Sequence, residues 1–201
     1  MEFDQQGNLL RHWGGQVDGA PYQWPLSNHG LWVDQKGFIW IGANHNSDSH
    51  ILKFTKDGKF IKAWGKKGSG PGEFDTPHGL ALDSQGRLFV ADRSNSRIQI
   101  FDQDGKFIAE WKQFGRPSGI FIDGNDTLYV ADHQSNAKIN PGIKRGIYIG
   151  SARDGTVRAF IPGLGADAES TSVGEGVAAD AAGSVYMSET GGMTVRKFLR
   201  K

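Results

Sequence analysis

The feature that most constrains this chain is a short block that occurs three times with one pattern. Each block begins on Phe, has Gly near its middle and ends on Trp, and the three copies span residues 3–13, 54–64 and 101–111. Copies separated by ~40–50 residues indicate a chain built by repeating one supersecondary unit.

A second motif lies upstream of these blocks and occurs four times. It starts with a variable residue that is followed by Gly and a short apolar run, and the four starting residues are His29, His78, Ser118 and Glu175. An Asp follows each run at the same distance, and these aspartates are Asp34, Asp83, Asp123 and Asp180. The sequence therefore contains four repeats.

Each repeat has the pattern of four short strands. In the second repeat we expect strands at 80–82, 88–91, 97–101 and 107–111, joined by Asp- and Gly-containing turns. Glycine adopts the positive φ that such turns need, and the aspartates are expected to cap them. The first two strands are almost entirely apolar, so both of their faces should be covered. Helical periodicity is absent, apart from one short turn of helix that residues 165–172 could form.

Four-stranded antiparallel units at this period are typical of a β-propeller. The Gly-His and Trp-Asp dipeptides of WD40 blades are missing, and a β-helix would need a much shorter repeat. We therefore predict one all-β domain over residues 1–201. Its blades are expected at about 25–66, 75–112, 115–162, and 172–201 plus 1–14.

The two ends of the chain suggest how the ring closes. The chain begins on a strand of the fourth type at 3–13 and ends after one of the third type at 194–199. Pairing the two would complete the last blade and remove two exposed edges. We expect this four-bladed closure, with a fragment of a six-bladed propeller as the alternative. A closed ring predicts a monomer, and an open one predicts an oligomer.

Composition excludes several classes of protein. The 29 glycines among 201 residues follow no collagen period, and the six Trp and 12 Phe are too many for a disordered chain. A net charge of +1 predicts no nucleic-acid or membrane partner. Without Cys, no disulfide or thiolate ligand is available. The N-terminal residues lack the features of a signal peptide, which predicts a cytoplasmic location unless an upstream segment was removed.

Two segments of the second repeat carry a family resemblance. Residues 68–83 and 90–101, with Pro77-His78-Gly79 and Ala91-Asp92-Arg93 among them, resemble an NHL repeat. The pattern is most similar to the lyase domain of peptide-amidating enzymes, peptidyl-α-hydroxyglycine α-amidating lyase. The resemblance implies a six-bladed propeller with zinc on three histidines at the starts of innermost strands, flanked by an arginine and a tyrosine.

Two of the zinc-ligand positions implied by this resemblance are kept in the chain. His29 and His78 match them, Glu175 stands at the third, and Ser118 occupies the equivalent place in the remaining blade. Arg93 matches an arginine position, and no residue matches the tyrosine.

The topology of the repeats places the candidate site independently of the family. In an antiparallel pair, the start of the first strand and the end of the second lie together. His29, His78 and Glu175 should then converge at one channel mouth, with Ser118 lining it. Imidazole and carboxylate suit zinc first, with iron or manganese as alternatives, and a structural calcium is a further option. The alternative for the histidines is a hydrogen bond to the neighbouring blade.

Loops at the same mouth supply candidate catalytic residues. Arg93 could hold a substrate carboxylate, and His133 or His45 could transfer protons. The alternatives are an ion pair of Arg93 with Asp92 or Glu189, and simple solvation of the two histidines.

We therefore predict a metal-dependent lyase or hydrolase that acts on a small polar substrate. A non-catalytic protein-interaction scaffold and a lactonase-like hydrolase are the rival interpretations, and the enzyme is favoured over the scaffold. The sequence does not specify the substrate, since fold does not determine the reaction.

Overall fold

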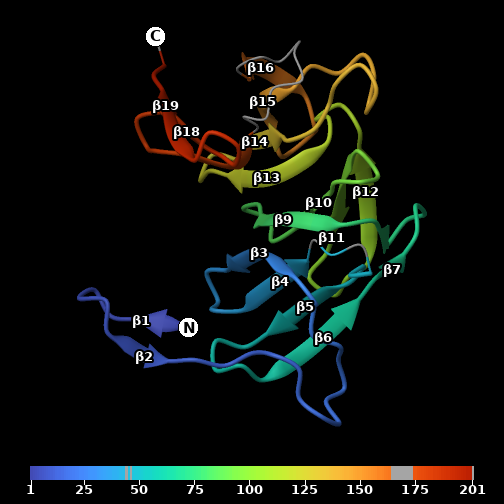
Figure 1. Ribbon diagram of the computed structural model, residues 1–201, viewed down its shortest axis with the longest axis vertical. Helices are drawn as coiled ribbons and strands as arrows, with labels where there is room; N and C mark the ends of the chain where they lie inside the picture. The colour runs from blue at the N-terminus through green and yellow to red at the C-terminus, as the bar shows by residue number, and fades with distance from the viewer. Residues whose placement is uncertain (44, 46, 164–173, 201) are drawn as a thin grey trace.

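The computed structural model describes residues 1–43, 45, 47–163 and 174–200, and every regular element in them is a β-strand. Four antiparallel sheets follow one another along an open arc, from the blue N-terminal region to the red C-terminal one (Figure 1). Each sheet is one blade, numbered here first to fourth in chain order. The residues 165–172, where the sequence suggested a turn of helix, lie outside the described part.

The blades run from an inner to an outer strand in chain order. The first blade is β3 (Asn28–Val33), β4 (Ile39–Ala43), β5 (Ile51–Phe54) and β6 (Phe60–Trp64). The second is β9 (Pro77–Leu82), β10 (Leu88–Asp92), β11 (Arg97–Phe101) and β12 (Phe107–Trp111). The third is β13 (Pro117–Ile122), β14 (Thr127–Asp132), β15 (Gly146–Ser151) and β16 (Val157–Pro162). The fourth has three strands, β17 (Gly174–Ala179), β18 (Val185–Glu189) and β19 (Thr194–Phe198).

The repeated Asp forms the turn between the first two strands of each blade, as predicted. The carboxylate of Asp83 accepts hydrogen bonds from the backbone N–H groups of Gln85 and Arg87, at 3.0 and 2.8 Å. In the third blade Asp126 stands where the other repeats have Gly, and it adopts a φ of 61°. Asp is one of the few residues that tolerates this left-handed conformation, so the turn survives the substitution.

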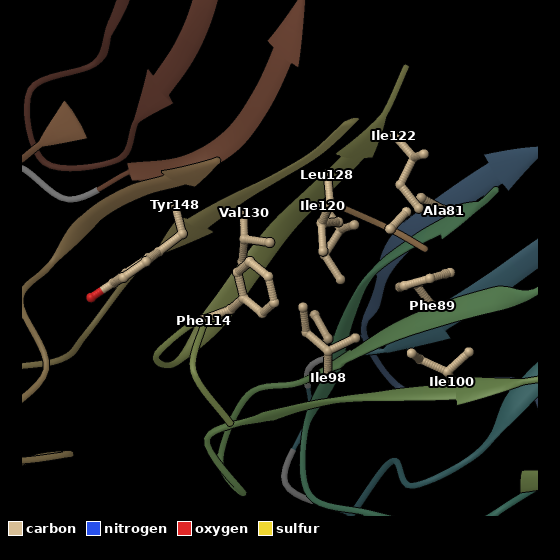
Figure 2. Close-up of a cluster of buried hydrophobic side chains, with 12 residues drawn as sticks. Ala81, Phe89, Ile98, Ile100, Phe114, Ile120, Ile122, Leu128, Val130 and Tyr148 are labelled. Atoms are coloured by element: carbon tan, nitrogen blue, oxygen red, sulfur yellow. The ribbon is translucent and has the colours of Figure 1, made fainter. Parts of the chain in front are cut away.

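The hydrophobic core is divided into clusters that lie between neighbouring blades. Figure 2 shows the cluster between the second and third blades, where Phe89, Ile98 and Ile100 face Phe114 and Leu128. These side chains are at most 1% exposed, and burying each stabilises the fold by roughly 1.5–3 kcal/mol. Similar clusters join the first blade to the second and the third to the fourth.

The all-β propeller arrangement with four blades is confirmed, but the N-terminal residues do not complete the last blade, so the predicted closure of the ring through them is wrong. Residues 2–11 form a hairpin of β1 (Glu2–Phe3) and β2 (Leu9–Arg11), and within the described part of the chain these two strands pair with each other alone. The hairpin lies beside the first blade, far from β19 (Figure 1). Of the two predicted architectures, only the fragment of a larger propeller fits an open arc.

Packing of the repeated Trp explains where the hairpin sits. In each copy of the block, the Trp lies against a turn glycine of the following blade: Trp13 on Gly58, Trp64 on Gly105 and Trp111 on Gly155. Trp13 also contacts Phe54 in a tilted arrangement, with ring centroids 5.1 Å apart. The hairpin therefore relates to the first blade as β5–β6 relates to the second.

The two ends of the arc leave apolar side chains uncovered. On β3, Leu31 is 65% exposed, whereas Leu80, at the same repeat position on β9, is 3% exposed. At the other end Val195 on β19 is 71% exposed. A short parallel pair, β7 (Lys66–Lys67) and β8 (Glu73–Phe74), joins the first two blades. No helix in the described residues is long and apolar enough to span a membrane.

Candidate functional site

The innermost strands β3, β9, β13 and β17 approach one another closely near their N-terminal ends. A glycine follows each of the first three channel residues. A Cβ at any of these glycines would lie within 3.0 Å of a backbone carbonyl oxygen in the next blade and would therefore collide with it. The contacts join Gly30 to His78, Gly79 to Ser118, and Gly119 to Glu175. The glycine of the motif is therefore what allows the channel residues to converge.

The four channel residues meet at the carboxylate of Glu175. Its Oε1 lies 3.0 Å from His29 Nε2 and 3.4 Å from His78 Nε2. Ser118 Oγ donates a hydrogen bond to the same oxygen at 2.6 Å. The ligand atoms of His29, His78 and Glu175 all lie within 4.8 Å of one another. The structure thus brings together every residue that the sequence placed at the channel.

His78 has no hydrogen-bond partner for either ring nitrogen in the described part of the chain, although its side chain is only 1% exposed. Its contact with Glu175 falls within ion-pair distance but is not a hydrogen bond. Burial lowers the pKa of His78 to about 4, so the imidazole is neutral at neutral pH. A neutral, buried imidazole with a free lone pair is suited to a metal ion, and a hydrogen bond to the neighbouring blade does not account for it.

His29 stacks on His78, with ring centroids 4.0 Å apart and the planes inclined at 26°. Its side chain is 31% exposed, so this side of the cluster opens to solvent. Burial alone would raise the pKa of Glu175, but its contacts with the three surrounding histidines and the hydrogen bond from Ser118 hold it well below its usual range. Glu175 is therefore ionised, and its negative charge lies beside the neutral imidazole of His78.

His133 supplies the third of these histidines. Its Nδ1 lies 2.6 Å from Glu175 Oε2 and 3.3 Å from the carbonyl oxygen of Gly174. Both neighbours accept hydrogen bonds, so Nδ1 carries a hydrogen and Nε2 is the atom that can receive a proton. The sequence placed His133 at this mouth but did not predict its bond to Glu175. That contact joins the third blade to the fourth, and no local sequence pattern predicts a contact between residues so far apart in the chain.

Arg93 lies near Glu175 at the same mouth, and among the described residues it makes neither of the ion pairs that were its alternative interpretation. Asp92 binds Arg97 instead, and Glu189 binds Arg196. Among the described residues the buried Nε of Arg93 has no hydrogen-bond partner. Burial lowers the pKa of Arg93, and the charge of Glu175 partly offsets this.

Arg116 is a neighbour of Arg93 that the sequence did not single out. Its guanidinium donates to the carbonyl oxygen of Ser94 at 3.3 Å and to Gln134 at 3.0 Å. The sequence feature that could have identified Arg116 is its position two residues before Ser118.

His45 is not part of the cluster as far as the described contacts go. It is exposed, and its Nδ1 lies 2.7 Å from Ser47 Oγ in its own loop. The repeated aspartates lie in the turns, where they bind backbone N–H groups, which confirms their structural role.

Family models match two parts of this chain. Residues 74–101 match the NHL repeat, and residues 31–86 match a 6-bladed beta-propeller. The chain carries an NHL repeat in a β-propeller domain. This confirms the predicted resemblance, and the second match agrees with the open arc.

Curated relatives of this NHL-repeat chain include NHL repeat-containing protein 3 from Homo sapiens, which is 28% identical over 84% of this chain. The alignment covers 48% of the human protein, so the chain spans about half its length. Peptidyl-glycine alpha-amidating monooxygenase from Mus musculus is 48% identical over 31% of this chain and 7% of that protein.

Solved structures share the fold at low identity. Virginiamycin B lyase from Staphylococcus aureus is 17% identical with a TM-score of 0.59, over 87% of this chain and 56% of that one. A gluconolactonase from Xanthomonas campestris is also 17% identical, with a TM-score of 0.63, over 94% of this chain and 61% of that one. At these identities the likeness concerns the propeller fold alone.

Proposed function

We propose that this chain is a metal-dependent lyase or hydrolase that acts on a small polar substrate at the channel mouth. The observation that carries the proposal is the convergence of His29, His78 and Glu175, with His78 buried and without a hydrogen-bond partner among the described residues. The match to a peptidyl-glycine alpha-amidating monooxygenase covers 31% of the chain and agrees with the resemblance to peptide-amidating enzymes that the sequence shows.

The three converging residues would hold the ion through two imidazole nitrogens and one carboxylate oxygen. This donor set fits zinc first, and iron or manganese as alternatives. The bound ion would lower the pKa of a water molecule or polarise a substrate oxygen. Calcium prefers six to eight oxygen ligands, so two imidazoles argue against it here and against the lactonase-like alternative.

The remaining residues of the mouth have separable roles in this proposal. Arg93, with no anionic side chain of its own among the described contacts, would bind a carboxylate or oxyanion of the substrate through its guanidinium. His133, whose Nδ1 faces two oxygens, would move a proton at Nε2. His45 stays a prediction from the sequence, since its described contacts lie within its own loop.

Calorimetric titration with zinc tests the proposal. Wild-type protein should bind one ion per chain, and His78→Ala should abolish binding while the far-ultraviolet circular dichroism stays unchanged. His12→Ala, which removes an exposed histidine outside the cluster, is the matched control and should bind like the wild type. Zinc binding retained in His78→Ala would place the site elsewhere and contradict the proposal.

A second candidate function is a non-catalytic interaction scaffold, favoured by the apolar side chains exposed at both ends of the arc. Leu31 and Val195 are the clearest examples. The same titration separates the two functions, because folded wild-type protein that takes up no divalent metal would support the scaffold.

A further inference from the structure

We infer that Ser118 and His133 are positioning residues that hold Glu175 as a ligand through one oxygen only. The inference rests on the proposed metal site and names two residues that shape it without touching the ion. Both belong to the third blade, Ser118 on β13 and His133 just after β14, whereas Glu175 lies on β17 of the fourth. The contacts therefore cross the interface between two blades.

The two residues bind opposite oxygens of the carboxylate. Ser118 Oγ donates to Oε1 at 2.6 Å, and His133 Nδ1 lies 2.6 Å from Oε2. Ser118 is completely buried, and the His133 side chain is 12% exposed, so water competes little for either contact. With both oxygens held, the carboxylate cannot rotate without breaking a short hydrogen bond.

This arrangement decides which oxygen a metal ion can reach. Oε1 faces the Nε2 atoms of His29 and His78, at 3.0 and 3.4 Å, whereas Oε2 is covered by His133. An ion among the three ligand atoms would meet Oε1 alone, and Glu175 would bind through a single oxygen. Such a set leaves coordination positions open for water or substrate, as catalytic zinc sites do.

Hydrogen bonds to a metal ligand commonly raise metal affinity by fixing the ligand's orientation, and losing one costs roughly 10- to 100-fold. The competing interpretation is that these two hydrogen bonds form a structural link, called a clip below, that only joins the third and fourth blades. A clip would contribute to the stability of the metal-free protein, but its loss would leave metal affinity unchanged. Affinity and stability must therefore be measured on the same variants.

The experiment titrates zinc into the wild type, His133→Ala, His133→Asn and Ser118→Ala, with His12→Ala as the control. Asn presents an N–H close to the place of Nδ1, so it keeps the donor that Ala removes. We expect the affinity for zinc to fall roughly 10- to 100-fold in His133→Ala and Ser118→Ala, and to recover most of the way in His133→Asn. The melting temperature of each metal-free variant reports whether it folds.

Each outcome decides for or against the inference. Wild-type affinity in folded His133→Ala and Ser118→Ala would overturn it while leaving the proposed function intact. An equal loss in His133→Asn and His133→Ala would overturn the role of the Nδ1 donor. Wild-type protein that binds no zinc would overturn the proposed function, and the inference with it. If His133→Ala fails to fold, Ser118→Ala, which removes only a hydroxyl, carries the test alone.

Discussion

At the scale of single residues, burial distinguishes the side chains that form the candidate site from exposed side chains that do not contact it. His78 and His45 have the same side chain, yet His78 is buried with no hydrogen-bond partner in the described part of the chain, whereas His45 is exposed and contacts its own loop. The sequence predicted both as candidates because it shows residue types and register. The sequence could not show that the imidazole of His78 is buried away from water. Because buried polar groups are normally paired, its nitrogen atoms, unpaired among the described residues, indicate a ligand.

Burial also predicts how much each turn aspartate contributes to stability. Asp83 accepts hydrogen bonds from two backbone N–H groups and from Arg87 Nε, and its side chain is completely buried. Asp102 accepts two similar backbone bonds in an exposed turn. Asp83→Ala should therefore lower the free energy of unfolding by about 1–3 kcal/mol, and Asp102→Ala by less than about 1 kcal/mol. Urea denaturation of both variants measures the difference, and equal losses would contradict this ranking.

At the scale of elements, the glycine that follows each channel residue sets the distance between inner strands. A Cβ on Gly79 would meet the carbonyl oxygen of Ser118 at 2.4 Å, whereas one on Gly124 would meet nothing within 4 Å. The first contact involves backbone atoms, so relief requires two blades to separate. The site geometry depends on that approach, because Ser118 binds Glu175 across the next interface.

Gly79→Ala should cost about 1–3 kcal/mol of stability through overpacking and should weaken zinc binding together with it. Gly124→Ala should change stability by less than about 1 kcal/mol and should leave zinc binding unchanged. Thermal unfolding and zinc titration of both variants provide the measurement. A Gly79→Ala protein with wild-type stability would show that the inner strands need no such close approach.

Most elements of the blades followed from the sequence because their signals are local. Turn residues and apolar runs placed 97–101 and 107–111, which the structure confirms as β11 and β12. The channel register was local too, since each position precedes a Gly. The position of the N-terminal strand depends on contacts distant in the sequence. The tendency of exposed strand edges to pair predicted the last blade as its partner, and this prediction was wrong. Packing of Trp13 on Gly58, a contact between repeats, is what holds that strand beside the first blade.

At the scale of the whole molecule, the arc is open and its inner strands differ in burial with position. Leu31 and Leu80 occupy the same place in the repeat, yet they are 65% and 3% exposed. Leu80→Ala should lower the free energy of unfolding by about 2–5 kcal/mol, and Leu31→Ala by less than about 1 kcal/mol. Denaturant titrations of both variants test the architecture. A large loss in Leu31→Ala would mean that β3 is covered in solution, as a closed ring or an oligomer would require.

The central claim combines these three scales, since one buried imidazole, closely approaching inner strands and the curved arc of blades together form one ligand cluster. Elemental analysis of the purified wild-type protein tests it most directly. We predict close to one divalent ion per chain, removed by a chelator and restored by adding zinc. Folded protein that holds no stoichiometric divalent ion, before or after zinc is supplied, would contradict the account.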